Sequence, residues 1–267
     1  MAGKYIRTNN MIVEYYRPQT LEEALDLLER DGPKTIPIGG GSTLNRLAPE
    51  PVSVVDLQSL PLKGIQKRGN YLEIGATVSL QMLLEHPDVA PVLKEVIQHE
   101  ASSNLRQVAS IAGTMMSADG RSPFITVLLA MDANLHWVDK TDRDGRNVGL
   151  GDLLPVRSPA PAGKLITQVN LPLMARLAYQ SVARSPADLP VACVAVAQWG
   201  SGRTRVALGG FGSAPVLALD GPEPGGAEIA AREAYAQAQD QWGSAVYRSD
   251  IAGVLTRRCL EELNGRG

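Results

Sequence analysis

Three consecutive glycines followed by two hydroxyl side chains are the residues of this chain best suited to bind a ligand. Gly39, Gly40 and Gly41 come directly after the short run "TIPI", and Ser42 and Thr43 follow them. Glycine adopts positive φ without strain and lets another group approach the backbone closely. Successive N–H groups in such a turn form a concave site for an anion. The segment therefore predicts a phosphate-binding loop, although a tight turn that merely needs glycine explains this motif equally well when it is taken alone.

A second stretch of small residues has a similar composition. The segment "SIAGTMMSADGRSP" contains Ser110, Ala112, Gly113 and Thr114, and it precedes the apolar stretch "FITVLLAMDA". Two small-residue loops in one domain could hold the two ends of a diphosphate. The alternative is an ordinary surface connection in front of a buried helix, and the residues alone leave both interpretations open.

Charge and cysteine content restrict the class of protein. The 267 residues carry 26 basic and 28 acidic side chains, and the basic residues are scattered, which is not typical of nucleic-acid binding. Cys193 and Cys259 stand alone in apolar or helical settings, so we expect buried thiols in a reducing compartment. The three histidines share no ligand spacing with carboxylates. We therefore expect no protein-bound metal.

No targeting segment is recognisable. The amino terminus lacks the apolar stretch of a secretion signal, and the longest apolar run is far shorter than the roughly 20 residues of a membrane helix. These features predict a cytoplasmic protein.

The pattern of apolar residues in the first part of the chain predicts an α+β fold. A helix should begin after Thr20, with Glu23 reaching back to the cap, and end at Gly32. Strands are expected at "KTIPIGG" and "VSVVDLQS", followed by a hairpin that turns at Gly69 and Asn70. The helix and the short strands together indicate mixed connections.

Farther along, Pro87 and Pro91 should divide a helical stretch into two helices. Residues 178–267 predict strands, then the linker "LDGPEPGGAE" and two helices, so we expect a domain boundary near residue 175. The apolar stretch "VACVAVAQW" and the helical tail suggest more apolar surface than so small a domain can cover. We therefore expect the segment from Ala178 onward to contribute to a partner interface.

A set of motifs in order along almost the whole chain resembles one known family. They are "YYRPQTLEEALDLL", "IPIGGGSTL", "LEIGATVSLQML", "NLRQVASIAG", "VLLAMDANL", "LITQVNLP" and "YRSDIAGVLTRRCLEEL". Together they resemble the FAD-binding medium subunit of the molybdenum hydroxylases, the group of xanthine and carbon monoxide dehydrogenases. The resemblance implies a two-subdomain α+β FAD-binding domain of the vanillyl-alcohol oxidase and p-cresol methylhydroxylase type at residues 1–174, divided near residue 60. A small α+β domain would follow at residues 175–267.

The resemblance also implies a set of cofactor-binding residues, with the FAD diphosphate on the glycine segment and on the Ser110–Thr114 segment. No His or Cys lies in either segment, so the FAD is expected to be non-covalent. The implied residues are Ile38, Gly39, Gly40, Gly41, Ser42, Thr43, Leu44, Arg106, Ala109, Ser110, Ile111, Gly113, Thr114, Asp119 and Ile166.

Several positions depart from the family pattern. Ala112 replaces a glycine, which would be strained at left-handed φ and harmless at negative φ. Thr114 replaces the usual asparagine. A family aspartate near the flavin falls on Pro123, and Asp119, four residues earlier, could serve instead; a lysine from the C-terminal domain falls on Ser181.

The function implied by the resemblance is that of an FAD-binding electron-transfer subunit of an oxidoreductase complex. It would pass electrons from the [2Fe–2S] clusters of a small subunit to NAD⁺ or another acceptor, while a large molybdenum-cofactor subunit oxidises the substrate, within a heterotrimer. The chain itself is assigned no catalytic or metal-binding residue. Two alternatives remain open: a structural or assembly subunit with weak or no FAD binding, and a stand-alone flavoprotein.

Overall fold

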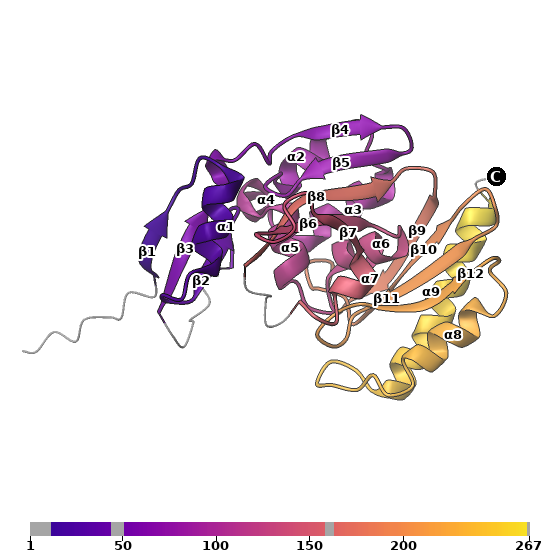
Figure 1. Cartoon of the computed structure of the whole chain (residues 1–267). Coiled ribbons are helices and arrows are strands. Elements are labelled where there is room, and N and C mark those ends of the chain that lie inside the picture. Colours follow the sequence, from indigo (N-terminus) through magenta and orange to yellow (C-terminus); the bar gives the residue numbers. More distant parts are fainter. Residues whose placement is uncertain (1–11, 44–50, 158–162, 266–267) are drawn as a thin grey trace, which may run out of the picture.

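Three β-sheets and the helices that cover them make up the part of the chain that the structure describes. A computed structural model of the chain describes residues 12–43, 51–157 and 163–265. Figure 1 shows a small N-terminal subdomain at one end, a larger middle subdomain, and a C-terminal sheet backed by two helices at the other end. The described part of the chain is thus α+β, as predicted.

The N-terminal subdomain is a parallel sheet of three short strands in the order β1-β3-β2 with one helix, α1, packed on it. Thr20 caps α1 by accepting a hydrogen bond from the Glu23 amide, as predicted. The Glu23 carboxylate accepts from the amide of Gln19, one residue before the predicted partner. The prediction that α1 ends at Gly32 was wrong, because the backbone of Arg30 is already extended. The elements are β1 (Ile12–Tyr16), α1 (Leu21–Glu29), β2 (Thr35–Ile38), β3 (Val52–Asp56) and the 3-10 turn η1 (Leu57–Ser59).

The middle subdomain is built on an antiparallel sheet in the order β4-β5-β8-β6-β7. The hairpin between β4 and β5 turns at Gly69, which has a φ of 56°, so the predicted turn is confirmed. The helical stretch is divided as predicted, because α2 ends before Pro87 and α3 begins at Pro91. The strands are β4 (Ile65–Arg68), β5 (Tyr71–Gly75), β6 (Asn134–Asp139), β7 (Arg146–Gly149) and β8 (Lys164–Pro172). The helices are α2 (Leu80–Glu85), α3 (Pro91–Glu100), α4 (Ser103–Val108), α5 (Ile111–Ser117), α6 (Pro123–Ala130) and α7 (Leu150–Leu153).

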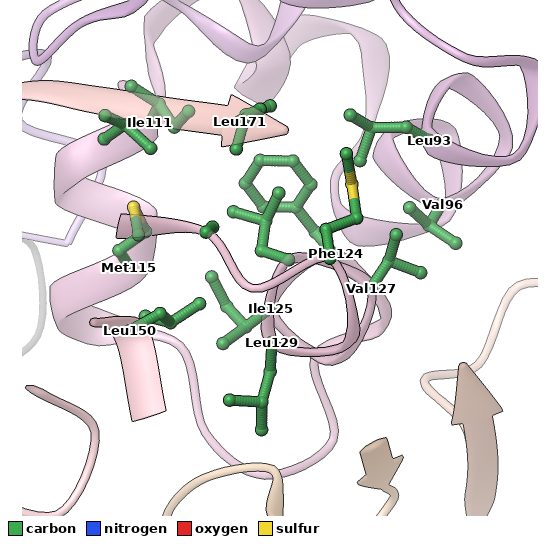
Figure 2. Packing of buried hydrophobic residues seen from close by; sticks show 14 of the residues in the cluster. Leu93, Val96, Ile111, Met115, Phe124, Ile125, Val127, Leu129, Leu150 and Leu171 are labelled. Atoms are coloured by element: carbon green, nitrogen blue, oxygen red, sulfur yellow. The ribbon is translucent and has the colours of Figure 1, made fainter. Parts of the chain in front are cut away.

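Helix α6 lies at the centre of the largest hydrophobic core. All eight of its residues are buried. Figure 2 shows the Phe124 ring between Leu171 of β8 and Leu93 of α3, with Ile125 beside Leu150, and Leu129 belongs to the same buried cluster. Burial of one such side chain contributes roughly 1.5–3 kcal/mol. This core therefore fixes α6 and the segments at its ends.

The C-terminal part is an antiparallel sheet in the order β12-β11-β10-β9 with two helices on one face. The predicted strands and the two helices are present, and the strand β12 was not predicted. Residues of β10 contact α6 on one face of the sheet and α9 on the other. The elements are β9 (Arg176–Val182), β10 (Ala192–Gln198), β11 (Thr204–Gly209), β12 (Val216–Gly221), α8 (Ala227–Ala234) and α9 (Ala245–Gly265).

The two-sided packing of β10 removes one of the two reasons for expecting a partner interface from Ala178 onward, although the interface itself stays a prediction. Every residue from Ala192 to Ala197 is buried within the chain. The apolar stretch "VACVAVAQW" therefore offers no spare surface to a partner, because α6 and α9 already cover it.

Candidate functional site

The glycine segment leaves β2 and turns at once. Of its three glycines, Gly41 alone has positive φ, at 70°. A β-carbon at Gly39 would come within 2.5 Å of the Ser110 hydroxyl, and one at Gly40 would overlap the Val108 carbonyl oxygen. The first two glycines are thus needed for close approach to another part of the chain. Positive φ accounts only for the third.

The second predicted loop is the end of one helix and the start of another. Ala109 follows α4, and Ser110 caps α5 by accepting a hydrogen bond from the Gly113 amide at 3.2 Å. The prediction of a loop was wrong here, because a serine cap with small residues after it also starts a helix. Ala112 lies inside α5 and does not have positive φ. Replacement of the family glycine by Ala112 therefore causes no backbone strain.

These two segments touch each other, and we call the contact of Gly39–Gly41 with Val108–Ser110 the seam. Next to this contact, Ser79 and Ser110 form an isolated antiparallel β-bridge, which helps to hold Ser110 in place. The amide of Ile111 donates to the Val78 carbonyl at 2.9 Å, and the amide of Ala112 donates to the Ala76 carbonyl at 3.3 Å. The first turn of α5 is thus held in place by the segment that precedes α2. Three cavities open around the seam.

The first cavity, which we call the apolar cavity, has a volume of about 270 Å³ and lies between the N-terminal and middle subdomains. The buried indole Nε1 of Trp137 has no hydrogen-bond partner among the described residues. The Lys164 ammonium lies 5.5 Å from the centre of the same indole ring. The lining is Ile36, Pro37, Gly39, Leu57, Ala76, Thr77, Ser110, Ala112, Gly113, Met116, Trp137, Lys164, Leu165 and Ile166.

The second cavity, which we call the acidic cavity, has a volume of about 190 Å³ and contains two carboxylates, Glu100 and Asp119. Glu100 accepts hydrogen bonds from the Ser122 hydroxyl at 2.7 Å and from the Phe124 amide at 3.1 Å. Burial raises the pKa of Glu100, although these two hydrogen bonds oppose the shift. The lining is Ser42, Thr43, Leu80, Glu100, Ala101, Leu105, Ala109, Thr114, Ser117, Ala118, Asp119, Ser122 and Leu189.

The third cavity, which we call the lysine cavity, opens on the other side of Gly39 and Gly40. Its polar side chains come from four separate segments, and Lys63 is the charged one among them. The lining is Gly39, Gly40, Gln58, Lys63, Thr77, Ser79, Gln107 and Val108.

The glycine segment meets the N-cap of α5 in the seam, and cavities open on several sides of this contact. A binding site for a dinucleotide would need such an arrangement. Residues 10–174 match the family described as the FAD binding domain in molybdopterin dehydrogenase. The chain belongs to this family. The match bears out the resemblance to the FAD-binding medium subunits of molybdenum hydroxylases, which are subunits of oxidoreductase complexes.

Relatives of this FAD-binding family cover almost the whole chain. The uncharacterized protein YgfM of Escherichia coli (strain K12) is 29% identical over 252 residues, which are 92% of this chain and 94% of the relative. The nicotine 6-hydroxylase medium subunit of Paenarthrobacter nicotinovorans is 30% identical over 279 residues, covering 95% and 98%. The structure of reconstituted CO dehydrogenase from Oligotropha carboxidovorans superimposes with a TM-score of 0.79 at 26% identity, covering 95% of this chain and 98% of that chain. The predicted α+β fold class is confirmed.

The structure brings most of the residues implied for this molybdopterin dehydrogenase subunit to the seam and its cavities, and places a few elsewhere. Arg106 is turned toward the end of α3, where it donates to the Ala101 carbonyl at 2.7 Å and to the Gln81 side chain. Ile38 ends β2, and Ile111 is fully buried in the core. Leu44 lies outside the described residues.

Two of the positions that depart from the family pattern lie at the acidic cavity, because Thr114 lines it and Pro123 follows Ser122 of its lining. Pro123 is the first residue of α6 and carries no charge, but the Glu100 carboxylate accepts from the residues on both sides of it. No local pattern in the sequence indicated Glu100, because it reaches this place from α3, more than 20 residues earlier. Ser181 is exposed on β9, opposite Cys193 in the neighbouring strand.

Helix α5 of this flavoprotein-family chain is fixed at its far end as well. The buried guanidinium of Arg157 donates to the carbonyls of Met115 and Ala118, at the end of α5, and to the Ser213 carbonyl at 2.9 Å. The residues that face the apolar and acidic cavities from α5 are therefore held at both ends of the helix.

Two observations concern what else the described residues could bind. They include no cluster of three or more His, Cys, Asp or Glu side chains arranged to hold a metal ion. None of their helices has the length and apolarity needed to cross a membrane. Both cysteines are buried, as predicted, and burial raises the pKa of Cys193 to about 11.

Proposed function

We propose that this chain binds FAD non-covalently and serves as the electron-transfer subunit of a molybdenum-containing hydroxylase or dehydrogenase. The seam carries the proposal, because it combines bare glycine backbone with the Ser110 hydroxyl in a chain of the FAD-binding family. Bound FAD would supply the redox chemistry, since the isoalloxazine accepts and releases electrons. The residues of this chain would hold and orient it.

The cavities fit the parts of such a cofactor. A flat ring system can lie in the apolar cavity, where the unpaired Trp137 N–H offers a hydrogen bond to a ring or ribose acceptor. The diphosphate would lie along the seam, close to Gly40, Gly41 and the Ser110 hydroxyl. Ser42, Thr43 and Thr114 line the acidic cavity and would contact the part of the cofactor beyond the diphosphate.

We further propose that the partners are a large molybdenum-cofactor subunit and a small subunit with two [2Fe–2S] clusters. Two relatives support this proposal, since one is the medium subunit of nicotine 6-hydroxylase and another is the medium chain of carbon monoxide dehydrogenase. Electrons would pass from the clusters to this chain and on to NAD⁺ or another acceptor. The FAD-binding domain at residues 1–174 and the C-terminal domain at residues 175–267 remain proposed divisions.

The test is purification of the tagged chain from its native host. We expect flavin absorbance in the visible range, release of FAD into the supernatant on heat denaturation, and co-purification of a molybdenum and an iron–sulfur subunit. Release of FMN, or flavin retained on the precipitate, would contradict non-covalent FAD. An intact flavin-free complex would favour the structural subunit, and turnover of an aldehyde or heteroaromatic compound by the pure chain would favour a self-sufficient enzyme.

A further inference from the structure

The three cavities around the seam differ in charge, and this difference limits where a diphosphate can lie. The acidic cavity contains the carboxyl groups of Glu100 and Asp119, which in their ionised form would repel the diphosphate. The apolar cavity is lined mainly by aliphatic side chains and Trp137, and its one cation, Lys164, lies 5.5 Å from the centre of the Trp137 ring, so this cavity suits a ring better than an anion. The lysine cavity has no carboxylate in its lining and carries Lys63.

Lys63 has its charge available for a ligand. Within the part of the chain that the structure describes, Lys63 forms no ion pair. The lysines and arginines around it are different, because Lys67 pairs with Asp88 at 2.9 Å and Arg68 pairs with Glu73 at 3.2 Å. A cation beside a cavity that lacks carboxylates is suited to an anionic ligand.

The backbone on both sides of Lys63 is fixed. The Leu62 carbonyl accepts from the Thr77 amide at 3.0 Å and from the Thr77 hydroxyl at 2.8 Å. The Gly64 carbonyl accepts from the Gly75 amide at 2.8 Å. The Lys63 side chain is exposed, but the backbone that carries it is hydrogen-bonded to Gly75 and Thr77. Ordering this side chain around a ligand therefore requires little movement of the backbone.

The lysine cavity also lies next to the place proposed for a ring. Gly39 and Thr77 line both the lysine cavity and the apolar cavity. A dinucleotide with one ring in the apolar cavity can therefore present its diphosphate to the bare backbone of Gly39 and Gly40 and to the lysine cavity.

We infer that Lys63 supplies the positive charge that holds the diphosphate of the bound dinucleotide, with Gln58 and Gln107 as additional donors at the same cavity. This inference rests on the proposed FAD binding, and it names a binding residue outside both small-residue segments. Lys63 is a binding residue and takes no part in electron transfer.

The experiment measures affinity for two flavins, FAD, which has the diphosphate and the adenosine attached to it, and riboflavin, which has neither. Wild-type protein is stripped of FAD and titrated with FAD and with riboflavin, which carries no phosphate, and flavin fluorescence reports binding. The same titrations are made with Lys63→Met, Lys63→Arg, Lys164→Met and the matched control Lys67→Met, which removes a lysine from the same strand region but away from this cavity. Thermal unfolding of each apo variant verifies the fold.

We expect Lys63→Met to weaken FAD binding about tenfold and to leave riboflavin binding within about twofold of wild type, because hydrogen bonds to charged groups are the strong ones. Lys63→Arg should retain most of the affinity, and Lys67→Met should match wild type. Undiminished FAD binding by Lys63→Met would overturn the inference, and so would equal losses for both flavins or an FAD-specific loss confined to Lys164→Met. A wild-type protein that binds neither flavin would instead refute the proposed function, and this outcome is visible before any variant is compared.

Discussion

The carbonyl oxygen of Val108 occupies the place that a β-carbon on Gly40 would need. Glycine is thus required at this position by the backbone at the end of α4, even when no ligand is bound. Because Gly40 and Val108 belong to two different subdomains in the proposed division, their contact sets how closely those subdomains approach at the site.

Gly40→Ala should therefore open the seam and weaken both the fold and cofactor binding. Forcing an extra carbon into a filled position costs about 1–3 kcal/mol. We expect a lower unfolding midpoint and a flavin content well below that of wild type, with Gly40→Val more severe. Gly64→Ala is the matched control, since a β-carbon there has nothing within 4 Å. Wild-type stability and full flavin in Gly40→Ala would show that the seam is not closed as described.

Glu100→Gln should change stability in a pH-dependent manner. Burial raises the pKa of Glu100, so unfolding releases a proton in the range above the ordinary glutamate pKa of about 4.3. The wild type must lose stability relative to the variant as the pH rises through this range. Unfolding midpoints of both proteins between about pH 4 and 8 test this, with Glu95→Gln, on an exposed position of α3, as the control for loss of one carboxylate. A difference that moves in the opposite direction would mean that the carboxylate is stabilised by its two hydrogen bonds more than it is destabilised by burial.

The two cysteines should be unreactive in the folded protein. Both side chains are fully buried, and burial raises the pKa of the Cys193 thiol to about 11 and that of the Cys259 thiol further. The thiolate is the reactive form, so a thiol reagent at about pH 8 should modify neither residue until the protein unfolds. Rapid modification of one thiol in the native protein would show that the C-terminal sheet opens locally.

Arg248→Met should unfold the C-terminal part of the chain. The Arg248 guanidinium is fully buried and donates to the carbonyls of Val191, Ala238 and Gly243 and to the Asp240 carboxylate. Removing it takes a donor from each of these acceptors and leaves the Asp240 carboxylate without its cation, although the amides of Trp242 and Gly243 still donate to that carboxylate, and the cost is about 3–5 kcal/mol. Urea denaturation measures the loss, and Arg248→Lys should recover only part of it because an ammonium cannot reach all of these acceptors.

Local signals in the sequence predicted much of the fold. Thr20 identified the start of α1, Pro87 and Pro91 the break between two helices, and Gly69 the hairpin. The same signals were insufficient at Ser110, where small residues suggested a loop and the serine instead caps a helix. The outcome there depends on contacts with Val78 and Ala76, which no local pattern contains.

The candidate site was predictable only where it is contiguous in sequence. The glycine segment and its hydroxyls stand together in the chain, whereas Glu100, Lys63 and Trp137 reach the cavities from separate elements. Arg106 matched the family pattern and yet caps the end of α3. Spacing along the chain identifies a motif, but the tertiary packing decides which side chains reach it.

The C-terminal sheet lies between α6 on one face and α9 on the other, and this has a consequence for dissecting the protein. Ala195 and Ala207 of the sheet belong to the same core as Phe124, although the family match ends at residue 174. A truncated chain ending there would present α6 to water along its length and would aggregate or fail to express. A separate family match in the sequence thus does not imply that the matched part folds by itself, and the part of this protein that matches the FAD-binding family can only be studied with its C-terminal part attached.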